Sequence, residues 1–124
     1  MGWRRALAIV GVAMALAGTL STPVTAQIGM ASWYGGGAHE RLSHTTASGA
    51  VFRPRTESTC AHRTLPFGTL LRIILGGHSV VCRVTDRGPA AYTHRVIDLS
   101  RKAADVIGLT ALGVAKVSIE IVSR

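Results

Sequence analysis

Asp86 and His62 are the residues whose types and positions best suit acid–base chemistry. Asp86 closes a run of alternating apolar residues and precedes the sequence Arg-Gly-Pro, which stops a strand, so its carboxylate is held firmly at a turn. A carboxyl group in such a position can donate and accept a proton in catalysis. The alternative role is structural, because aspartates commonly accept backbone hydrogen bonds in turns. A lone histidine beside a strand start, such as His62, is likewise more often structural.

One histidine pair superficially resembles a metal site. His39, Glu40 and His44 approach the His-Glu-x-x-His pattern of zinc proteases, but the second histidine comes one position too late. Five steps along a helix would put the two histidines about 140° apart, where they cannot share a zinc ion. The glycines before this segment also disfavour a helix. We therefore expect no metal and no other cofactor.

The first 26 residues are predicted to direct export. Two arginines precede an uncharged stretch from 6 to 20, and small residues lead to a cleavage site expected after Ala26. The stretch is shorter than the ~20 apolar residues that span a bilayer, which favours a cleaved signal peptide over an uncleaved anchor. We expect residues 1–26 to be a signal peptide, and residues 27–124 to be one domain without a stable membrane anchor, periplasmic or secreted, in the bacterial cell envelope.

Basic residues outnumber acidic ones, with 14 Lys and Arg against 6 Asp and Glu. Removal of the signal peptide would lower the net charge from +8 to +6, since that segment holds two arginines and no acidic residue. An exported cation attracts phosphate-bearing wall polymers, peptidoglycan carboxylates or anionic lipid headgroups, and nucleic acid is a poor candidate outside the cytoplasm. The alternative is that scattered arginines merely keep the protein soluble, because the sequence contains no basic block.

Cys60 and Cys82 are the two cysteines of the chain. In an oxidising compartment an even pair is most simply a disulfide, which would close a loop of a little over twenty residues and contribute roughly 3 kcal/mol. The competing interpretation is a catalytic thiol with His62 as its base. Exported thiols tend to oxidise, so we favour the disulfide.

Short strands separated by glycine turns dominate the domain. We expect strands at 29–34, 69–75, 79–85, 95–99 and 117–121, the second and third joined as a hairpin by Gly76-Gly77-His78. Ser100 and Gly108 suit the two ends of a short helix at 101–107. Alternation along the third strand would put Asp86 on the same side as Val84, at the rim of the core. These patterns predict a small, mainly β barrel with little helix.

Five segments in a fixed order carry a family resemblance. They are Gly29-Met-Ala-Ser-Trp-Tyr-Gly35, Thr46-Ala-Ser-Gly49, Ala61-His-Arg-Thr-Leu-Pro-Phe-Gly-Thr69, Val84-Thr-Asp-Arg-Gly-Pro89 and Ile97-Asp-Leu-Ser100. Together they resemble the rare lipoprotein A (RlpA) family of septal-ring lytic transglycosylases over about residues 29–122. The third and fourth segments are far more specific than any single short motif.

The resemblance implies a six-stranded double-psi β-barrel with one or two short helices, a fold also seen in expansins. It implies cleavage of the bond between N-acetylmuramic acid and N-acetylglucosamine without water, leaving a 1,6-anhydromuramyl end on peptide-stripped glycan. Asp86 matches the family's essential aspartate, which we expect to be the general acid and base. His62 matches its histidine and is expected to hydrogen-bond Asp86 or assist proton transfer. Tyr34, Ser48 and Arg87 are expected to bind substrate.

The chain departs from the family pattern at Ala50, where a glutamate is expected directly after Thr-Ala-Ser-Gly. Glu57 or Glu40 could replace that carboxylate. The departure keeps open a second hypothesis, an expansin-like module that binds or loosens peptidoglycan without cutting it. A third is a cationic structural or effector protein of the wall. The expected partners are glycan strands and divisome or other cell-wall proteins, and we expect a monomer.

Overall fold

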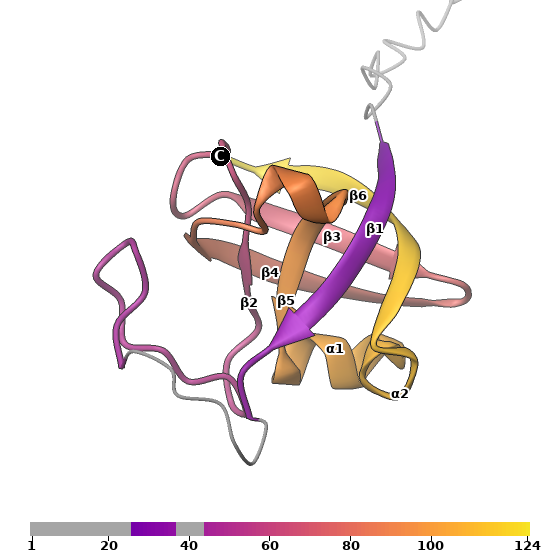
Figure 1. Ribbon diagram of the computed structural model, residues 1–124, viewed down its shortest axis with the longest axis horizontal. Coiled ribbons are helices and arrows are strands. Elements are labelled where there is room, and N and C mark those ends of the chain that lie inside the picture. The colour runs from indigo at the N-terminus through magenta and orange to yellow at the C-terminus, as the bar shows by residue number, and fades with distance from the viewer. Residues whose placement is uncertain (1–25, 37–43) are drawn as a thin grey trace, which may run out of the picture.

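The computed structural model describes residues 26–36 and 44–124. Six strands close into a barrel in the order β1-β5-β2-β4-β3-β6, which confirms the expected six-stranded architecture (Figure 1). In chain order the elements are β1 Gln27–Tyr34, β2 Thr59–Ala61, β3 Leu70–Leu75, β4 His78–Asp86, a 3₁₀ turn η1 Ala91–Thr93, β5 Arg95–Ser100, α1 Arg101–Ile107, α2 Leu109–Leu112 and β6 Val114–Ser123. No helix in these two ranges is long and apolar enough to cross a membrane.

Two sequence-based predictions fall outside these ranges. Residues 1–25 of the expected signal peptide are not among the described residues. Neither are His39 and Glu40, two of the three residues in the pattern that resembles a zinc site. The signal peptide and the absence of a metal therefore stay predictions.

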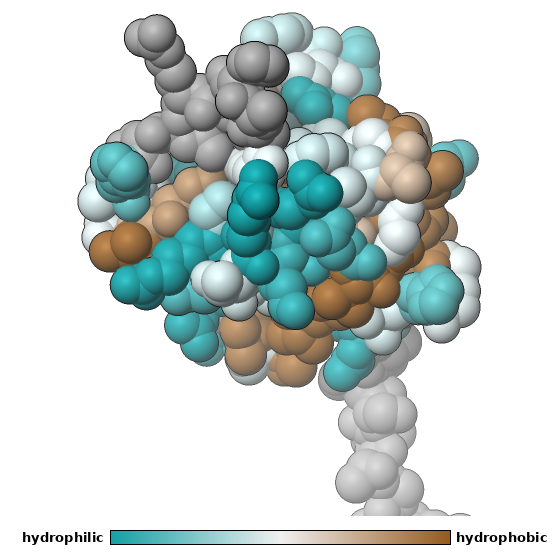
Figure 2. All heavy atoms as spheres, turned by 90° about the horizontal axis from the view of Figure 1, so that it is seen from below, coloured by the Kyte–Doolittle hydropathy of each residue, from teal (hydrophilic) through white to brown (hydrophobic). Residues whose placement is uncertain are grey.

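Helix α1 begins and ends where its caps predict. The Ser100 side chain accepts a hydrogen bond from the Ala103 N–H, and Gly108 adopts the left-handed conformation that ends the helix. Its inner face buries Ala103, Ala104 and Ile107 against the barrel. Figure 2 views the end of the barrel that carries α1 and α2, where hydrophilic side chains gather at the centre of the face. The helices thus cover the core at this end and turn polar residues outward.

The core fills the barrel and the space beneath α1. Its buried apolar residues are Ala31, Cys60, Leu71, Ile73, Cys82, Val84, Ile97, Leu99, Ala103, Ala104, Ile107, Leu109, Val117 and Ile119. Every strand and both helices contribute to it. Strand β2 and helix α2 had no counterpart in the sequence-based expectations, because three or four residues are too few to show a hydrophobic period.

Asp86 does not lie on the same side of β4 as Val84, so the expected alternation is wrong at this point. Cys60 of β2 pairs with Val84, but the next residue, Ala61, pairs with Asp86. Thr85 is therefore an extra residue in β4, and a bulge of this kind turns the following side chain to the other face. Val84 and Thr85 are buried, whereas Asp86 is half-buried. The bulge carries the carboxylate out of the core to the barrel surface.

The disulfide between Cys60 and Cys82 is present, with Cα atoms 5.8 Å apart. It joins the neighbouring strands β2 and β4, and both cysteines are fully buried. The catalytic-thiol alternative is therefore wrong, because no cysteine is free.

Candidate active site

The two oxygens of the Asp86 carboxylate have different surroundings. Oδ1 accepts hydrogen bonds from the backbone N–H groups of Arg87 at 2.9 Å and Ala47 at 3.1 Å. Oδ2 accepts a hydrogen bond from the Tyr34 hydroxyl, at 3.3 Å, and from no other described residue. One oxygen thus fixes the orientation of the group. The other is the oxygen that can exchange a proton with a substrate.

Tyr34 reaches Asp86 from the end of β1. Its ring stacks on Phe52, with centroids 5.0 Å apart and planes 10° from parallel. Gly35 lets this segment approach closely, because a Cβ there would lie 2.4 Å from the Pro54 side chain. Burial raises the pKa of Tyr34, and the negative charges of Asp86 and Asp98 raise it further. The phenol therefore stays protonated and acts as a hydrogen-bond donor.

Ser48 lies in a tight turn beside Asp86. Its backbone N–H donates to the Thr85 carbonyl at 3.0 Å, and its hydroxyl lies 2.9 Å from the Thr46 hydroxyl. The Thr46 N–H also donates to the Ala50 carbonyl, which closes the turn. Ser48 and Ala50 are both exposed. The structure therefore brings Tyr34, Ser48 and Asp86 together, as the motifs predicted.

His62 follows β2 and contacts Asp86 through the main chain. Its backbone N–H donates to the Asp86 carbonyl at 3.2 Å. The imidazole Nδ1 accepts the N–H groups of Thr64 at 3.2 Å and Leu65 at 3.1 Å, which leaves the proton on Nε2. Among the described residues no hydrogen bond joins this imidazole to the Asp86 carboxylate. The predicted direct bond is therefore absent, because the ring is held by its own loop.

His62 should make the protein less stable in mild acid. Burial lowers the pKa of His62, and the nearby Arg63 and Arg87 lower it further. Its contribution to stability is then complete above the unfolded pKa of about 6.5 and is lost as the pH falls through the folded pKa. In His62→Asn, whose amide oxygen can accept the same two N–H groups without titrating, this part of the pH dependence should disappear. Denaturant unfolding between about pH 4.5 and 7.5 measures it.

The control for that experiment is His78→Asn, since His78 is exposed at the start of β4. Its pH dependence should match that of the wild type. A His62→Asn variant that loses stability in acid as steeply as the wild type would contradict the role given to Nδ1.

Arg87 holds the loop that follows β2. Its Nη1 donates to the carbonyls of His62 at 3.1 Å and Leu65 at 2.7 Å, and its guanidinium lies 3.9 Å from the centre of the Phe67 ring. These contacts occupy one face of the side chain, which is otherwise exposed. Contact of Arg87 with substrate stays a prediction.

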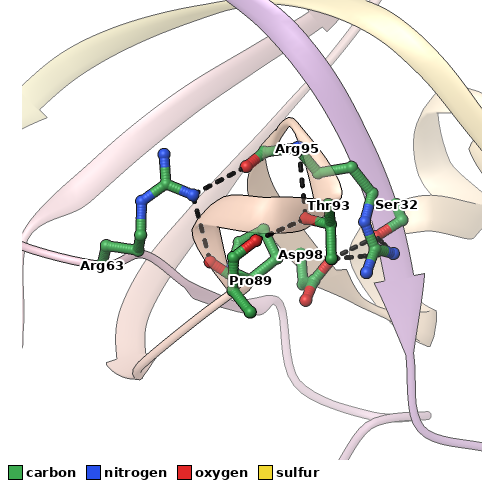
Figure 3. A network of polar contacts seen from close by, with 7 residues as sticks. Ser32, Arg63, Pro89, Thr93, Arg95 and Asp98 are labelled. Atoms are coloured by element: carbon green, nitrogen blue, oxygen red, sulfur yellow. Dashed lines mark hydrogen bonds and ion pairs between the residues drawn. The ribbon is translucent and has the colours of Figure 1, made fainter.

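Arg63 lies in the same loop and hydrogen-bonds the turn that follows β4. Its Nη1 donates to the carbonyls of Pro89 at 3.1 Å and Arg95 at 3.0 Å (Figure 3). The loop at 62–67 and the turn at 86–89 therefore hold each other through two arginines.

A polar cluster on β1 and β5 was missed by the sequence analysis. Asp98 accepts a hydrogen bond from the Ser32 hydroxyl and lies 3.7 Å from Arg95 Nη1 (Figure 3). Arg95 also donates to Ser32 at 2.5 Å. A lone carboxylate between the apolar residues Ile97 and Leu99 was the one signal available in the sequence.

A cavity of about 450 Å³ adjoins the loop at 62–65. His62, Arg63 and Leu65 form its wall, and Val96 and Ile119 are among the apolar residues that complete it. Asp86 does not line this cavity, so the two share only the His62 loop. Within the described part of the chain, no group of three or more His, Cys, Asp or Glu side chains could hold a metal ion.

Comparison with known proteins agrees with the motifs. A family model described as "Lytic transglycolase" matches residues 26–119. Curated relatives include the "Probable endolytic peptidoglycan transglycosylase RlpA" of Synechocystis sp., 49% identical over 96 residues. They also include the "Endolytic peptidoglycan transglycosylase RlpA" of Rickettsia bellii and of Neisseria meningitidis, each 42% identical over 96 residues. Each alignment covers 76% of this chain but only 28%, 41% and 38% of those relatives, so the chain spans less than half their length.

Among solved structures, the Streptomyces papain inhibitor (SPI) superposes with a TM-score of 0.63 at 18% identity. The match covers 81% of this chain and 97% of that one, and it shows a shared double-psi barrel fold alone. The family model, by contrast, matches most of the chain and includes all five motif segments. The chain therefore belongs to the RlpA-like family of lytic transglycosylases.

Proposed function

We propose that the protein is a peptidoglycan lytic transglycosylase of the cell envelope, with Asp86 as general acid and base. The observation that carries this proposal is the Asp86 carboxylate itself. A bulge directs it to the surface, two backbone N–H groups anchor Oδ1, and Oδ2 faces the Tyr34 hydroxyl. The names of the relatives support the same reaction and substrate.

The first step breaks the glycosidic bond. Asp86 in its acid form gives a proton to the oxygen that links C1 of N-acetylmuramic acid to the next N-acetylglucosamine. The C1–O bond breaks, and positive charge develops at C1 and the ring oxygen. The Tyr34 hydroxyl stabilises the negative carboxylate that remains on Asp86, because it donates to Oδ2.

The second step closes the anhydro ring. The C6 hydroxyl oxygen of the same muramic acid attacks C1, and the carboxylate of Asp86 takes the hydroxyl proton. The products are a 1,6-anhydromuramyl end and a free N-acetylglucosamine end, with no water consumed. Asp86 finishes in its acid form, so one carboxyl group serves both steps.

The surroundings of Asp86 suit a polymer. Ser48, Ala50 and Arg87 are exposed around the half-buried carboxylate, so these residues are available to contact a glycan strand. In this proposal Ser48 binds a sugar hydroxyl, Tyr34 contacts the sugar ring, and the Nε2–H of His62 donates to substrate from the loop beside the cavity.

The test uses the full chain expressed in a bacterium and purified from the periplasm in the form that the cell makes. The protein is incubated with peptide-stripped glycan strands, and the products are analysed by mass spectrometry. Anhydromuramyl ends are expected. Binding to the strands without such ends would overturn the proposal in favour of the expansin-like binding module, for which the specific observation is Ala50. The intact mass of the same sample also tests cleavage after Ala26.

Ala50→Glu should raise turnover about tenfold or more. Ala50 is exposed in the turn whose Ala47 N–H holds Asp86, so a glutamate there adds a second carboxyl group at the edge of the site without displacing packed atoms. The initial rate of anhydromuramyl formation measures the effect. Ala111→Glu is the matched control, because it adds the same charge at an exposed position of α2. Equal rates in both variants and the wild type would show that this chain does not need a glutamate at position 50.

A further inference from the structure

Asp98 and Asp86 lie in one row across four strands. Ser32 of β1 pairs with Asp98 of β5, Asp98 pairs with Ala61 of β2, and Ala61 pairs with Asp86 of β4. Paired residues on neighbouring strands share a face of the sheet. The two aspartates therefore emerge on the same face with one strand between them, which sets their Cα atoms about 10 Å apart.

The bulge at Thr85 creates this arrangement. Without it, Asp86 would continue the alternation of Val84 and point to the core side, away from Asp98. The intervening residue is Ala61, the smallest side chain that can stand between two carboxylates on this face. The structure thus aims two acidic groups at the same surface from non-neighbouring strands.

Asp98, like Asp86, is anchored through its Oδ1, but by different partners. Its two partners among the described residues both contact Oδ1, which accepts the Ser32 hydroxyl and lies 3.7 Å from Arg95 Nη1. Oδ2 has no hydrogen bond within the described ranges, and the side chain keeps 18% of its surface exposed. Figure 3 shows Arg95 folded back over Ser32 and Asp98 from the start of β5. Each carboxylate therefore has one oriented oxygen and one available oxygen.

Tyr34 interacts with both charges. Its hydroxyl donates to Asp86, and its pKa is raised by the electrostatic effect of Asp86 and, to a smaller extent, Asp98. Because Coulomb interactions fall with distance, this phenol is within electrostatic reach of both carboxylates.

We propose that Asp98 is the second carboxylate of the active site and that its negative charge stabilises the oxocarbenium-like C1 while Asp86 moves the protons. This inference rests on the proposed transglycosylase function. The reaction develops positive charge at C1, and a fixed carboxylate in a partly dry site stabilises that charge in the transition state. Arg95 forms an ion pair with Asp98, and the Ser32 hydroxyl sets the orientation of the carboxylate. Asp98 thereby supplies the second carboxylate. The family pattern places a glutamate at position 50, where this chain has Ala50.

The division of roles follows from the different partners. Asp86 is held by two backbone N–H groups and a phenol, and it has no ion-pair partner among the described residues. Asp98 has the guanidinium of Arg95 3.7 Å from its Oδ1, and this ion pair suits a group whose role is electrostatic. Carboxyl groups in glycoside-cleaving sites stand about 5 to 9.5 Å apart, a separation that carboxylates on strands two positions apart can reach.

The test is Asp98→Asn, which preserves the shape of the side chain and removes its charge. We expect kcat on peptide-stripped glycan to fall about 100-fold or more, with KM within about threefold of the wild type. Asp98→Glu should recover part of kcat, because it restores the charge. Asp105→Asn is the matched control, since Asp105 is also paired with an arginine, at 3.1 Å from Arg101, but lies exposed on α1. Its kcat should equal that of the wild type.

Ser32→Ala gives a second measurement with the charge kept. It removes the hydroxyl that orients Asp98, and kcat should fall about tenfold. Thermal unfolding and circular dichroism of each variant show whether the barrel is intact. If Asp98→Asn is unfolded, a folded Ser32→Ala with wild-type kcat overturns the inference.

The outcomes separate this inference from the proposed function. An active wild type together with an inactive, folded Asp98→Asn supports both. An active wild type with an equally active Asp98→Asn overturns the role of Asp98 and leaves the transglycosylase proposal standing. A wild type that makes no anhydromuramyl ends overturns the function, and the role of Asp98 with it.

Discussion

Asp86→Asn is expected to reduce the formation of anhydromuramyl ends about 1,000-fold, because an amide cannot give up or take a proton as a carboxyl group does. The substitution leaves the local structure in place. Asparagine keeps an Oδ1 that can accept the N–H groups of Ala47 and Arg87, which are 3.1 and 2.9 Å from the carboxylate. Mass spectrometry of products from peptide-stripped glycan measures the loss, and co-sedimentation with the same strands should show binding retained.

This variant also separates the catalytic role of Asp86 from the alternative role of capping a turn. Asparagine caps turns as well as aspartate does, so a structural role predicts an active variant. Asp105→Asn again serves as the control for loss of one exposed negative charge. Persistence of anhydromuramyl products in Asp86→Asn would remove Asp86 from the proposed mechanism.

Reduction of the Cys60–Cys82 disulfide is expected to cost about 3 kcal/mol of unfolding free energy. The bond closes a loop with a sequence separation of 22 residues, and the cross-link limits the freedom of the unfolded chain. A domain of about 100 residues buries a modest core, so the melting temperature should fall by roughly 12–24 °C. Thermal unfolding monitored by circular dichroism, with and without reductant, measures the change.

The double variant with Cys60→Ala and Cys82→Ala is the control for the reductant. Its melting temperature should be low in both conditions, and the agent should change it little. Both cysteines are fully buried, so this variant also loses their packing and should melt no higher than the reduced wild type. A reduced wild type that melts within a few degrees of the oxidised protein would contradict the stabilising role of the bond.

Much of the fold followed from local patterns. The hairpin of β3 and β4 follows from two β-rich runs around Gly76 and Gly77, and α1 follows from Ser100 and Gly108 at its ends. Each of these signals involves residues close together in the chain. The order of the five motif segments added the double-psi barrel, which period-two patterns alone could not distinguish from another small barrel.

The site was predictable only in part. Motifs named Asp86, Tyr34 and Ser48, and the structure brings these three together. The expected bond between the His62 imidazole and Asp86 is absent because Nδ1 accepts N–H groups of its own loop. That competition involves backbone geometry at 62–65, which residue types alone do not reveal.

The sequence by itself determined Asp86 as the candidate acid–base residue, the approximate positions of the longer strands and the two ends of α1, since those depend on side-chain type and short-range period. Tertiary structure alone decided that Thr85 is an extra residue in β4, because a bulge exists only relative to the partner strand β2. It likewise decided that Asp98 lies on the face of Asp86. The two aspartates share a face because both pair with Ala61 of β2. Strand β2 has only three residues, and no local sequence pattern predicts which strands pair with it.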